Sequence, residues 1–165
     1  MFNKKILSFI FLAWFIFLIF FNYFSYRKLW LDEVFVLDNL QKLNYFEIFG
    51  PLYNSQAFPR LYLFLIKLLS TPFNYNILAL RFFPLVFSLF SVFIWYFVFK
   101  KIMPKKYLLL LFAFISSYFI VYYSAELKPY SIDVFLVGLV SFLLLYKERF
   151  KRFFIFTPFL LFFSY

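Results

Sequence analysis

Two adjacent carboxylates, Asp32 and Glu33, stand out in a chain of 165 residues that has only seven acidic residues. They lie in the stretch LWLDEVFVLD, directly after the first long apolar run. The chain has no His and no Cys, which excludes His-dependent triads, His-ligated metals, disulfides and thiolate chemistry. Any acid–base chemistry therefore falls to Asp, Glu, Lys or Tyr.

Two further polar runs interrupt the apolar sequence. One is Gln56–Arg60, and the other is Glu126–Tyr130, which contains Lys128. A run of this kind could arise by chance. Three of them on the same side of a membrane would predict one site that holds both carboxylates and cations.

Asp32 and Glu33 each have a structural interpretation as well. Asp32 could cap a helix that begins near Val34, although Phe35 stands where a capping box would have Glu or Gln. Glu33 could be a solvated first-turn carboxylate, which the helix dipole favours. From spacing alone, the structural interpretation is the stronger one.

The cations and the third run also have alternatives. Arg60 and Arg81 could anchor helix ends among lipid headgroups. At Arg60 the charge would oppose the dipole of a helix starting at Pro59, a placement that suits a residue facing a lipid phosphate. Glu126 and Lys128 could pair with each other, and Tyr130 could belong to an interfacial aromatic belt.

Composition indicates what must position these residues. The chain is 66% hydrophobic and 30% aromatic, whereas soluble domains are about 45–50% apolar. Repeated apolar runs predict an all-α polytopic membrane protein with a single domain over 1–165. The expected fold has about four transmembrane helices and a truncated fifth, with interfacial helices in the first outer loop. The expected spans are 6–24, 82–99, 107–123, 131–146 and 153–165.

The net charge of +10 fits this class. Ten of the 17 basic residues lie at the N-terminus, in 100–106 and in 147–152, if the short helix at 59–72 does not span. The positive-inside rule then places these segments in the cytoplasm and the loop 27–81 outside. Six of the seven acids fall on or near the outer face. We therefore expect no nucleic-acid partner.

The segment PRLYLFLIKLLSTP (59–72) supports that topology. Its apolar part covers about 12 residues, or roughly 18 Å of helix, against a hydrocarbon core of roughly 30 Å. Lys67 interrupts it and Pro72 ends it. We expect a helix that lies at the membrane interface.

Four local motifs, in order, carry a family resemblance: LWLDEV, SQAFPRLYLFLIKLL, LRFFPLVFSLFSVFIWYFVFKKI and YYSAELKPYSIDVF. Over about residues 1–150 the chain resembles the N-terminal part of C-type (GT-C) membrane glycosyltransferases. It is most similar to the bacterial group related to protein O-mannosyltransferases and aminoarabinose transferases. These are polytopic enzymes that use polyprenyl-phosphate-linked sugars.

The chain departs from the family pattern at several positions. Phe58 stands where the juxtamembrane motif has His, Arg60 where it has a second Pro, and Ala125 where the fourth motif has Gln. The last run, 153–165, contains Pro158 and has only 13 residues of the roughly 20 that a span needs. We expect the N-terminal part of a longer protein.

The resemblance implies roles for individual residues. Asp32 would be the catalytic base, and Glu33 would orient it or bind the acceptor or a metal. Arg60 and Lys128 would contact the donor phosphate, Glu126 would hold Lys128 or a sugar hydroxyl, and Tyr130 would stack on the sugar or prenyl chain. The cofactor requirement is unknown, because two carboxylates make an incomplete divalent-metal site. The implied partners are a polyprenyl-phosphate sugar donor, a lipid, glycan or protein acceptor, and membrane lipids.

Two other classes of function remain open at this level. A non-catalytic membrane protein or degraded remnant would keep the same apolar helices without using the polar runs. A transporter or flippase would use Glu126, Lys128 and Asp133, but it predicts inverted repeats and discontinuous helices that the sequence does not contain.

Overall fold

The computed structural model describes residues 4–150, 152–153 and 157–158, and within these residues it is all-helical. The α-helices are α1 (Lys4–Tyr23), α2 (Leu31–Lys42), α3 (Arg60–Ser70), α4 (Ile77–Ile102), α5 (Tyr107–Ile115), α6 (Tyr118–Tyr123), α7 (Tyr130–Leu145) and α8 (Lys147–Phe150). Three short 3₁₀ turns are η1 (Glu47–Phe49), η2 (Tyr53–Ser55) and η3 (Thr71–Phe73). The all-helical expectation is confirmed, and most of the expected span 153–165 lies outside the described residues.

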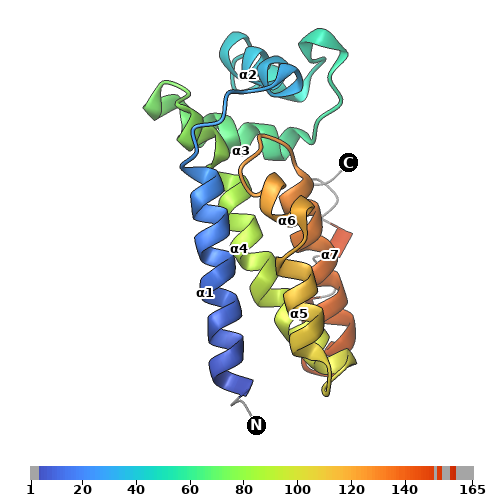
Figure 1. Ribbon diagram of the computed structural model, residues 1–165. Helices are drawn as coiled ribbons and strands as arrows, with labels where there is room; N and C mark the ends of the chain where they lie inside the picture. The colour runs from blue at the N-terminus through green and yellow to red at the C-terminus, as the bar shows by residue number, and fades with distance from the viewer. Residues whose placement is uncertain (1–3, 151, 154–156, 159–165) are drawn as a thin grey trace.

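Two of the described helices, α1 and α4, are long and apolar enough to cross a membrane. They stand side by side in Figure 1, where the chain begins at the lower end of α1. Helix α4 starts at Ile77, five residues before the expected start, because the Asn76 side chain caps it by accepting a hydrogen bond from Leu78 N at 2.9 Å. Arg81 therefore lies inside the helix rather than at its beginning.

The expected span 107–123 is divided into α5 and α6. Ser117 adopts extended backbone angles, and Ser116 N and Ser117 N bond back to the end of α5. Neither helix alone has the length of a span. Helix α7 is apolar but has 16 residues, so it falls slightly short of the roughly 20 that a perpendicular crossing needs.

Helices α2 and α3 lie together at one end of the upright helices, and α3 runs across that end (Figure 1). With 11 residues α3 measures roughly 17 Å, too short to cross a bilayer. One face of α3 is buried through Tyr62, Leu63 and Ile66, which belong to a core shared with α2, η1, α4 and α7. A short helix lying across the bundle end agrees with the interfacial helix expected at 59–72.

Lys67, which interrupts the apolar pattern of α3, is only 5% exposed. Its ammonium donates to the carbonyl oxygen of Leu40, in the last turn of α2, and to the Tyr75 hydroxyl at 3.1 Å. The last carbonyls of a helix lack intrahelical partners, so a cation there is favourable. Lys67 thereby fixes the end of α2 onto α3.

Helices α4 and α7 pack most closely at Gly138. A Cβ added there would lie 2.8 Å from Ile94 Cγ2 and 2.8 Å from Trp95 Nε1. The Trp95 indole also donates to the carbonyl of Val134 at 3.1 Å. The missing side chain lets the two helices approach each other.

Candidate functional site

The centre of the candidate site is an ion pair between Asp32 and Lys128, whose atoms Oδ2 and Nζ lie 3.0 Å apart. The two residues are 96 positions apart in the sequence. The Asp32 side chain is 41% exposed and that of Lys128 is 8% exposed. The Trp30 ring lies beside the pair, with its centroid 5.4 Å from the ammonium. The first and third polar runs therefore meet, as the sequence predicts.

Asp32 lies in the first turn of α2 and does not cap it. The helix begins at Leu31 and its N-cap residue is Trp30, so the alternative in which Asp32 caps a helix starting near Val34 is wrong. The N3 residue, Glu33, accepts a hydrogen bond from Trp30 N at 3.3 Å. This is the carboxylate half of a capping box, and it leaves Asp32 free of a capping role.

Glu33 is completely buried and forms an ion pair with Arg81, with 3.0 Å between Oε2 and Nη2. Its other oxygen accepts a hydrogen bond from Leu127 N at 2.6 Å. One carboxylate thus connects α2, α4 and the loop 124–129, so the idea of a solvated first-turn carboxylate is wrong. Because both oxygens are engaged and buried, Glu33 is suited to orienting its neighbour and not to contacting an acceptor.

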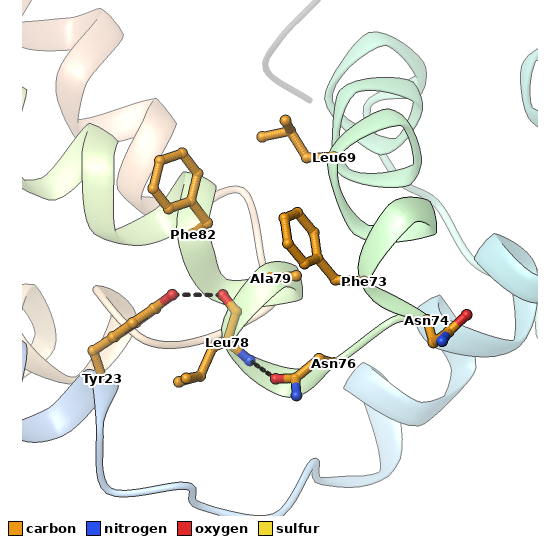
Figure 2. A pocket seen from close by; sticks show the side chains of 8 residues that line it. All are labelled: Tyr23, Leu69, Phe73, Asn74, Asn76, Leu78, Ala79 and Phe82. Atoms are coloured by element: carbon orange, nitrogen blue, oxygen red, sulfur yellow. Dashed lines mark hydrogen bonds between the residues drawn. The ribbon is translucent and has the colours of Figure 1, made fainter.

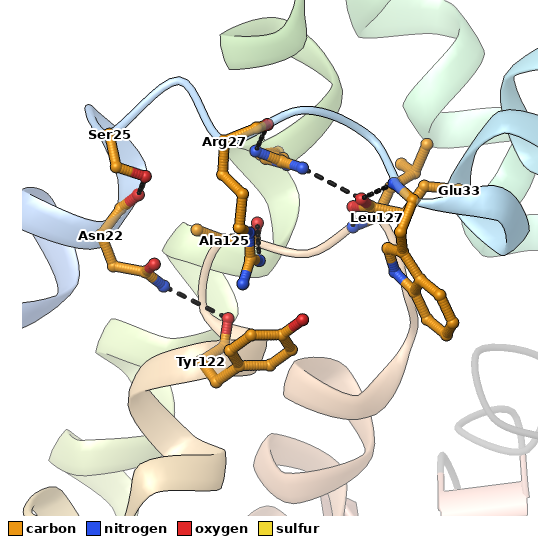
Figure 3. Close-up of polar contacts among 9 residues, drawn as sticks. Asn22, Ser25, Arg27, Glu33, Tyr122, Ala125 and Leu127 are labelled. Carbon is orange, nitrogen blue, oxygen red and sulfur yellow. Dashed lines mark hydrogen bonds and ion pairs between the residues drawn. The ribbon is translucent and has the colours of Figure 1, made fainter.

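Two arginines also bind this region: Arg81 in α4 and Arg27 in the segment between α1 and α2, the second of which is labelled in Figure 3. Arg81 Nη1 donates to the carbonyl of Arg27 at 2.8 Å, and Arg27 Nη2 donates to the carbonyl of Ala125 at 3.1 Å. The Arg27 guanidinium also lies 4.1 Å from the centroid of the Tyr122 ring. Arg81 is 0% exposed, so the expectation that it anchors α4 among lipid headgroups is wrong.

Asn22, at the end of α1, fastens this junction to α6. Its amide nitrogen donates to the carbonyls of Val121 at 2.7 Å and Tyr122 at 3.2 Å. These carbonyls belong to the last turn of α6, where intrahelical partners are missing. The contact, drawn in Figure 3, fixes the start of the loop 124–129.

Glu126 is fully buried, and neither of its carboxylate oxygens has a hydrogen-bond partner. Burial raises the pKa of the Glu126 carboxyl above its ordinary value, and the nearby charge of Glu33 raises it further. The charges of Arg27 and Lys128 act in the opposite direction and do not cancel the effect. The expected Glu126–Lys128 pair is not formed, because the Lys128 ammonium pairs with Asp32.

The remaining candidates are Arg60 and Tyr130, and neither forms a hydrogen bond or ion pair with Asp32 or Lys128 among the described contacts. Arg60 begins α3, and its Nη1 is buried without a hydrogen-bond partner. Two residues further on, the Tyr62 hydroxyl donates to the carbonyl of Lys128 at 3.1 Å. Tyr130 is 39% exposed, and its ring lies 4.6 Å from that of Tyr123. Helix α3 is therefore joined to the Lys128 backbone, whereas Tyr130 packs toward α6.

Two pockets flank the junction. The larger, with a volume of about 600 Å³, lies where the end of α1, η3 and the start of α4 meet (Figure 2). Its lining is mostly apolar and consists of Tyr23, Leu69, Phe73, Asn74, Asn76, Leu78, Ala79 and Phe82. The smaller, of about 280 Å³, lies between α4, α6 and α7 and includes Tyr130 and Asp133. Neither pocket is lined by Asp32 or Lys128.

The Asp32–Glu33 pair is a poor fit for a divalent metal. Within the described residues no three Asp, Glu, His or Cys side chains gather where they could hold one ion. Glu33 already neutralises Arg81 and accepts hydrogen bonds from the Leu127 and Trp30 backbone. A calcium or magnesium site needs about six oxygen ligands, which this arrangement does not offer.

Sequence reasoning missed the contribution of Arg27 and Arg81. The signal was present for Arg81, since an arginine inside an apolar helix is almost always paired.

Compared with known protein families, curated proteins and solved structures, the chain has no match.

Proposed function

We propose that the chain belongs to a membrane glycosyltransferase that transfers a sugar from a polyprenyl-phosphate donor to an acceptor hydroxyl. The observation that carries the proposal is the Asp32–Lys128 pair. It combines a half-exposed carboxylate with an ammonium whose stem is buried, at the end of the helices where α2 and α3 lie. A carboxylate and a cation are the two groups that this transfer requires.

The chemistry needs little else. The acceptor oxygen attacks the anomeric carbon, and the bond from that carbon to the phosphate oxygen breaks. The electron pair leaves with the phosphate, whose growing charge Lys128 and Arg60 stabilise. The proton of the acceptor hydroxyl passes to Asp32. Because phosphate is a good leaving group, no general acid is needed, which suits a chain without His.

The proposal includes a topology. Spans at 6–24, 82–99, 107–123, 131–146 and 153–165 would place the N-terminus in the cytoplasm and the loop 27–81 outside. The basic clusters around 100–106 and 147–152 support this orientation. The site would then face the outer side of the cytoplasmic membrane, within reach of a lipid donor. The apolar lining of the larger pocket suits a hydrocarbon chain better than a sugar.

The donor class is the first thing to test. The protein in detergent is supplied with an acceptor extract and a radiolabelled sugar, carried either on polyprenyl phosphate or on a nucleoside diphosphate. Transfer from the polyprenyl phosphate alone is expected. Transfer only from the nucleotide, or label that never leaves either donor, would contradict the proposal.

A further inference from the structure

The Asp32–Lys128 pair raises a question about the proposed reaction, because it joins the two groups that the reaction needs separately. The pairing directs Oδ2 of Asp32 toward Lys128 at 3.0 Å. In that position the ammonium is directed at Asp32 and not at a donor phosphate. Lys128 must therefore turn away from Asp32 to neutralise the phosphate, and both oxygens of Asp32 are then free of the ammonium.

Lys128 is the fixed member of the pair. Its carbonyl accepts a hydrogen bond from the Tyr62 hydroxyl at 3.1 Å, and the N–H of the preceding residue, Leu127, donates to Glu33 at 2.6 Å. Its side chain is 8% exposed, so it is packed over nearly its whole surface. A ligand at this position therefore meets a cation that is already in place.

Asp32 is the movable member. Its side chain is 41% exposed, and within the described residues Lys128 is its one ion-pair partner. Turning Asp32 away breaks a single partly solvated contact of modest strength. Its neighbour Glu33 cannot replace it at Lys128, because Glu33 is buried against Arg81.

We propose that Lys128 exchanges partners during the reaction: it pairs with Asp32 before the donor binds, and it pairs with the donor phosphate afterwards, which releases Asp32 to accept the proton. The inference rests on the proposed function, since the phosphate belongs to its donor. The donor phosphate is a diester with one charge and two free acceptor oxygens, and it becomes a monoester with up to two charges as the sugar leaves, so it competes with one carboxylate for an ammonium increasingly well as the reaction proceeds. The base is thus released from the ammonium when the donor is in place.

The exchange makes an unusual prediction for Asp32→Asn. Removing the carboxylate removes the competitor for Lys128, so the variant should bind phosphate about three- to fivefold more tightly than the wild type. Lys128→Gln should weaken binding by at least about tenfold, because a charge-assisted hydrogen bond is lost. Lys128→Arg keeps the cation and should retain most of the affinity.

Helix α2 supplies a matched control. Asp38 forms an exposed ion pair with Lys42 on the same helix, at 3.1 Å. Asp38→Asn makes the same change in net charge as Asp32→Asn, away from Lys128. It should leave the affinity for phosphate unchanged.

The experiment titrates the purified chain in detergent with farnesyl phosphate, and in parallel with inorganic phosphate, and follows tryptophan fluorescence because Trp30 lies beside Lys128. Tighter binding of farnesyl phosphate by Asp32→Asn alone supports the exchange. Equal or weaker binding by Asp32→Asn, an equal gain in Asp38→Asn, or no binding of farnesyl phosphate by the wild type overturns it. Equal affinity for the two probes overturns the assignment of the ligand to a lipid.

Measuring sugar transfer with the same proteins separates this inference from the proposed function. A wild type that transfers sugar while Asp32→Asn shows no gain in affinity overturns the exchange alone. A wild type that binds farnesyl phosphate with the expected pattern but transfers no sugar overturns the function alone.

Discussion

Glu33 and Arg81 form an ion pair in which both side chains are completely buried, 48 residues apart in the sequence and 3.0 Å apart in space. The same carboxylate accepts the N–H of Leu127. The pair therefore joins α2, α4 and the loop that carries Lys128. Each member of the Asp32–Lys128 pair is adjacent in the sequence to a residue that this buried pair fixes, namely Glu33 and Leu127. The Glu33–Arg81 pair therefore stabilises the candidate site.

Removing one member of the Glu33–Arg81 pair should destabilise the protein strongly. Glu33→Leu leaves the Arg81 charge buried without a partner, and we expect a loss of about 3–5 kcal/mol in the free energy of unfolding. The double variant Glu33→Leu/Arg81→Met removes both charges and should recover much of that loss. It still leaves Leu127 N without an acceptor, at a cost of about 1–3 kcal/mol.

Denaturant unfolding in detergent, arranged as a double-mutant cycle, measures this coupling. Lys42→Met, which breaks an exposed pair on α2, serves as the control and should change stability by less than about 1 kcal/mol. If the losses in unfolding free energy of the two single variants simply add in the double variant, the Glu33–Arg81 ion pair does not stabilise the contact between α2, α4 and the loop 124–129.

Glu126 should make stability depend on pH. Its pKa in the folded protein is raised above the ordinary value of 4.5 by burial and by Glu33. The folded state therefore holds the proton more tightly, and this contribution is fully present below pH 4.5. It is lost as the pH rises from the unfolded pKa through the folded one, because a buried charge then has to form.

Glu126→Gln keeps the shape of the neutral acid and removes the titration. Its stability relative to the wild type should rise with pH across that window. Melting temperatures measured between about pH 4 and pH 8 provide the comparison. Parallel curves for the two proteins would mean that Glu126 does not titrate in this range.

Gly138→Ala should disrupt the packing of α4 against α7. The added Cβ would lie 2.8 Å from both Ile94 Cγ2 and Trp95 Nε1, closer than packed atoms allow. Overpacking of this kind costs about 1–3 kcal/mol. Val137→Ala, at a neighbouring position that is 57% exposed, is the control and should have little effect in detergent.

Thermal unfolding monitored by circular dichroism gives the comparison. A second variant, Gly138→Ala/Trp95→Phe, should recover part of the loss because the indole nitrogen no longer occupies the space. If Gly138→Ala unfolds at the wild-type temperature, the close approach of α4 and α7 is not as described.

The sequence could predict the long apolar helices α1 and α4 and a short helix within 59–72, since these follow from hydropathy and length. It could not predict that α4 starts at Ile77, because the cap comes from the single side chain of Asn76. Nor could it predict the division of 107–123, where two serines lie within an otherwise apolar run. One or two polar residues change the mean hydropathy of a whole span very little, so they do not show in a prediction based on that mean.

For the site, the sequence indicated that the first and third polar runs share a location, and the pairing of Asp32 with Lys128 agrees with this. It did not distinguish which acid pairs with which cation. Three acids (Asp32, Glu33 and Glu126) and three cations (Arg27, Arg81 and Lys128) meet here, and the fold places Glu33 against Arg81 in the interior and Asp32 beside Lys128 at the surface. Neighbours in the sequence, they lie in opposite environments.

The role of Asp32 as the base is the central claim, and the rate of sugar transfer by Asp32→Asn tests it most directly. The assay compares the wild type, Asp32→Asn and Asp38→Asn at saturating polyprenyl-phosphate sugar, with equal amounts of folded protein. Loss of a general base predicts that kcat falls by about 10²–10⁴-fold in Asp32→Asn, while Asp38→Asn matches the wild type. A wild-type kcat in Asp32→Asn would contradict the account.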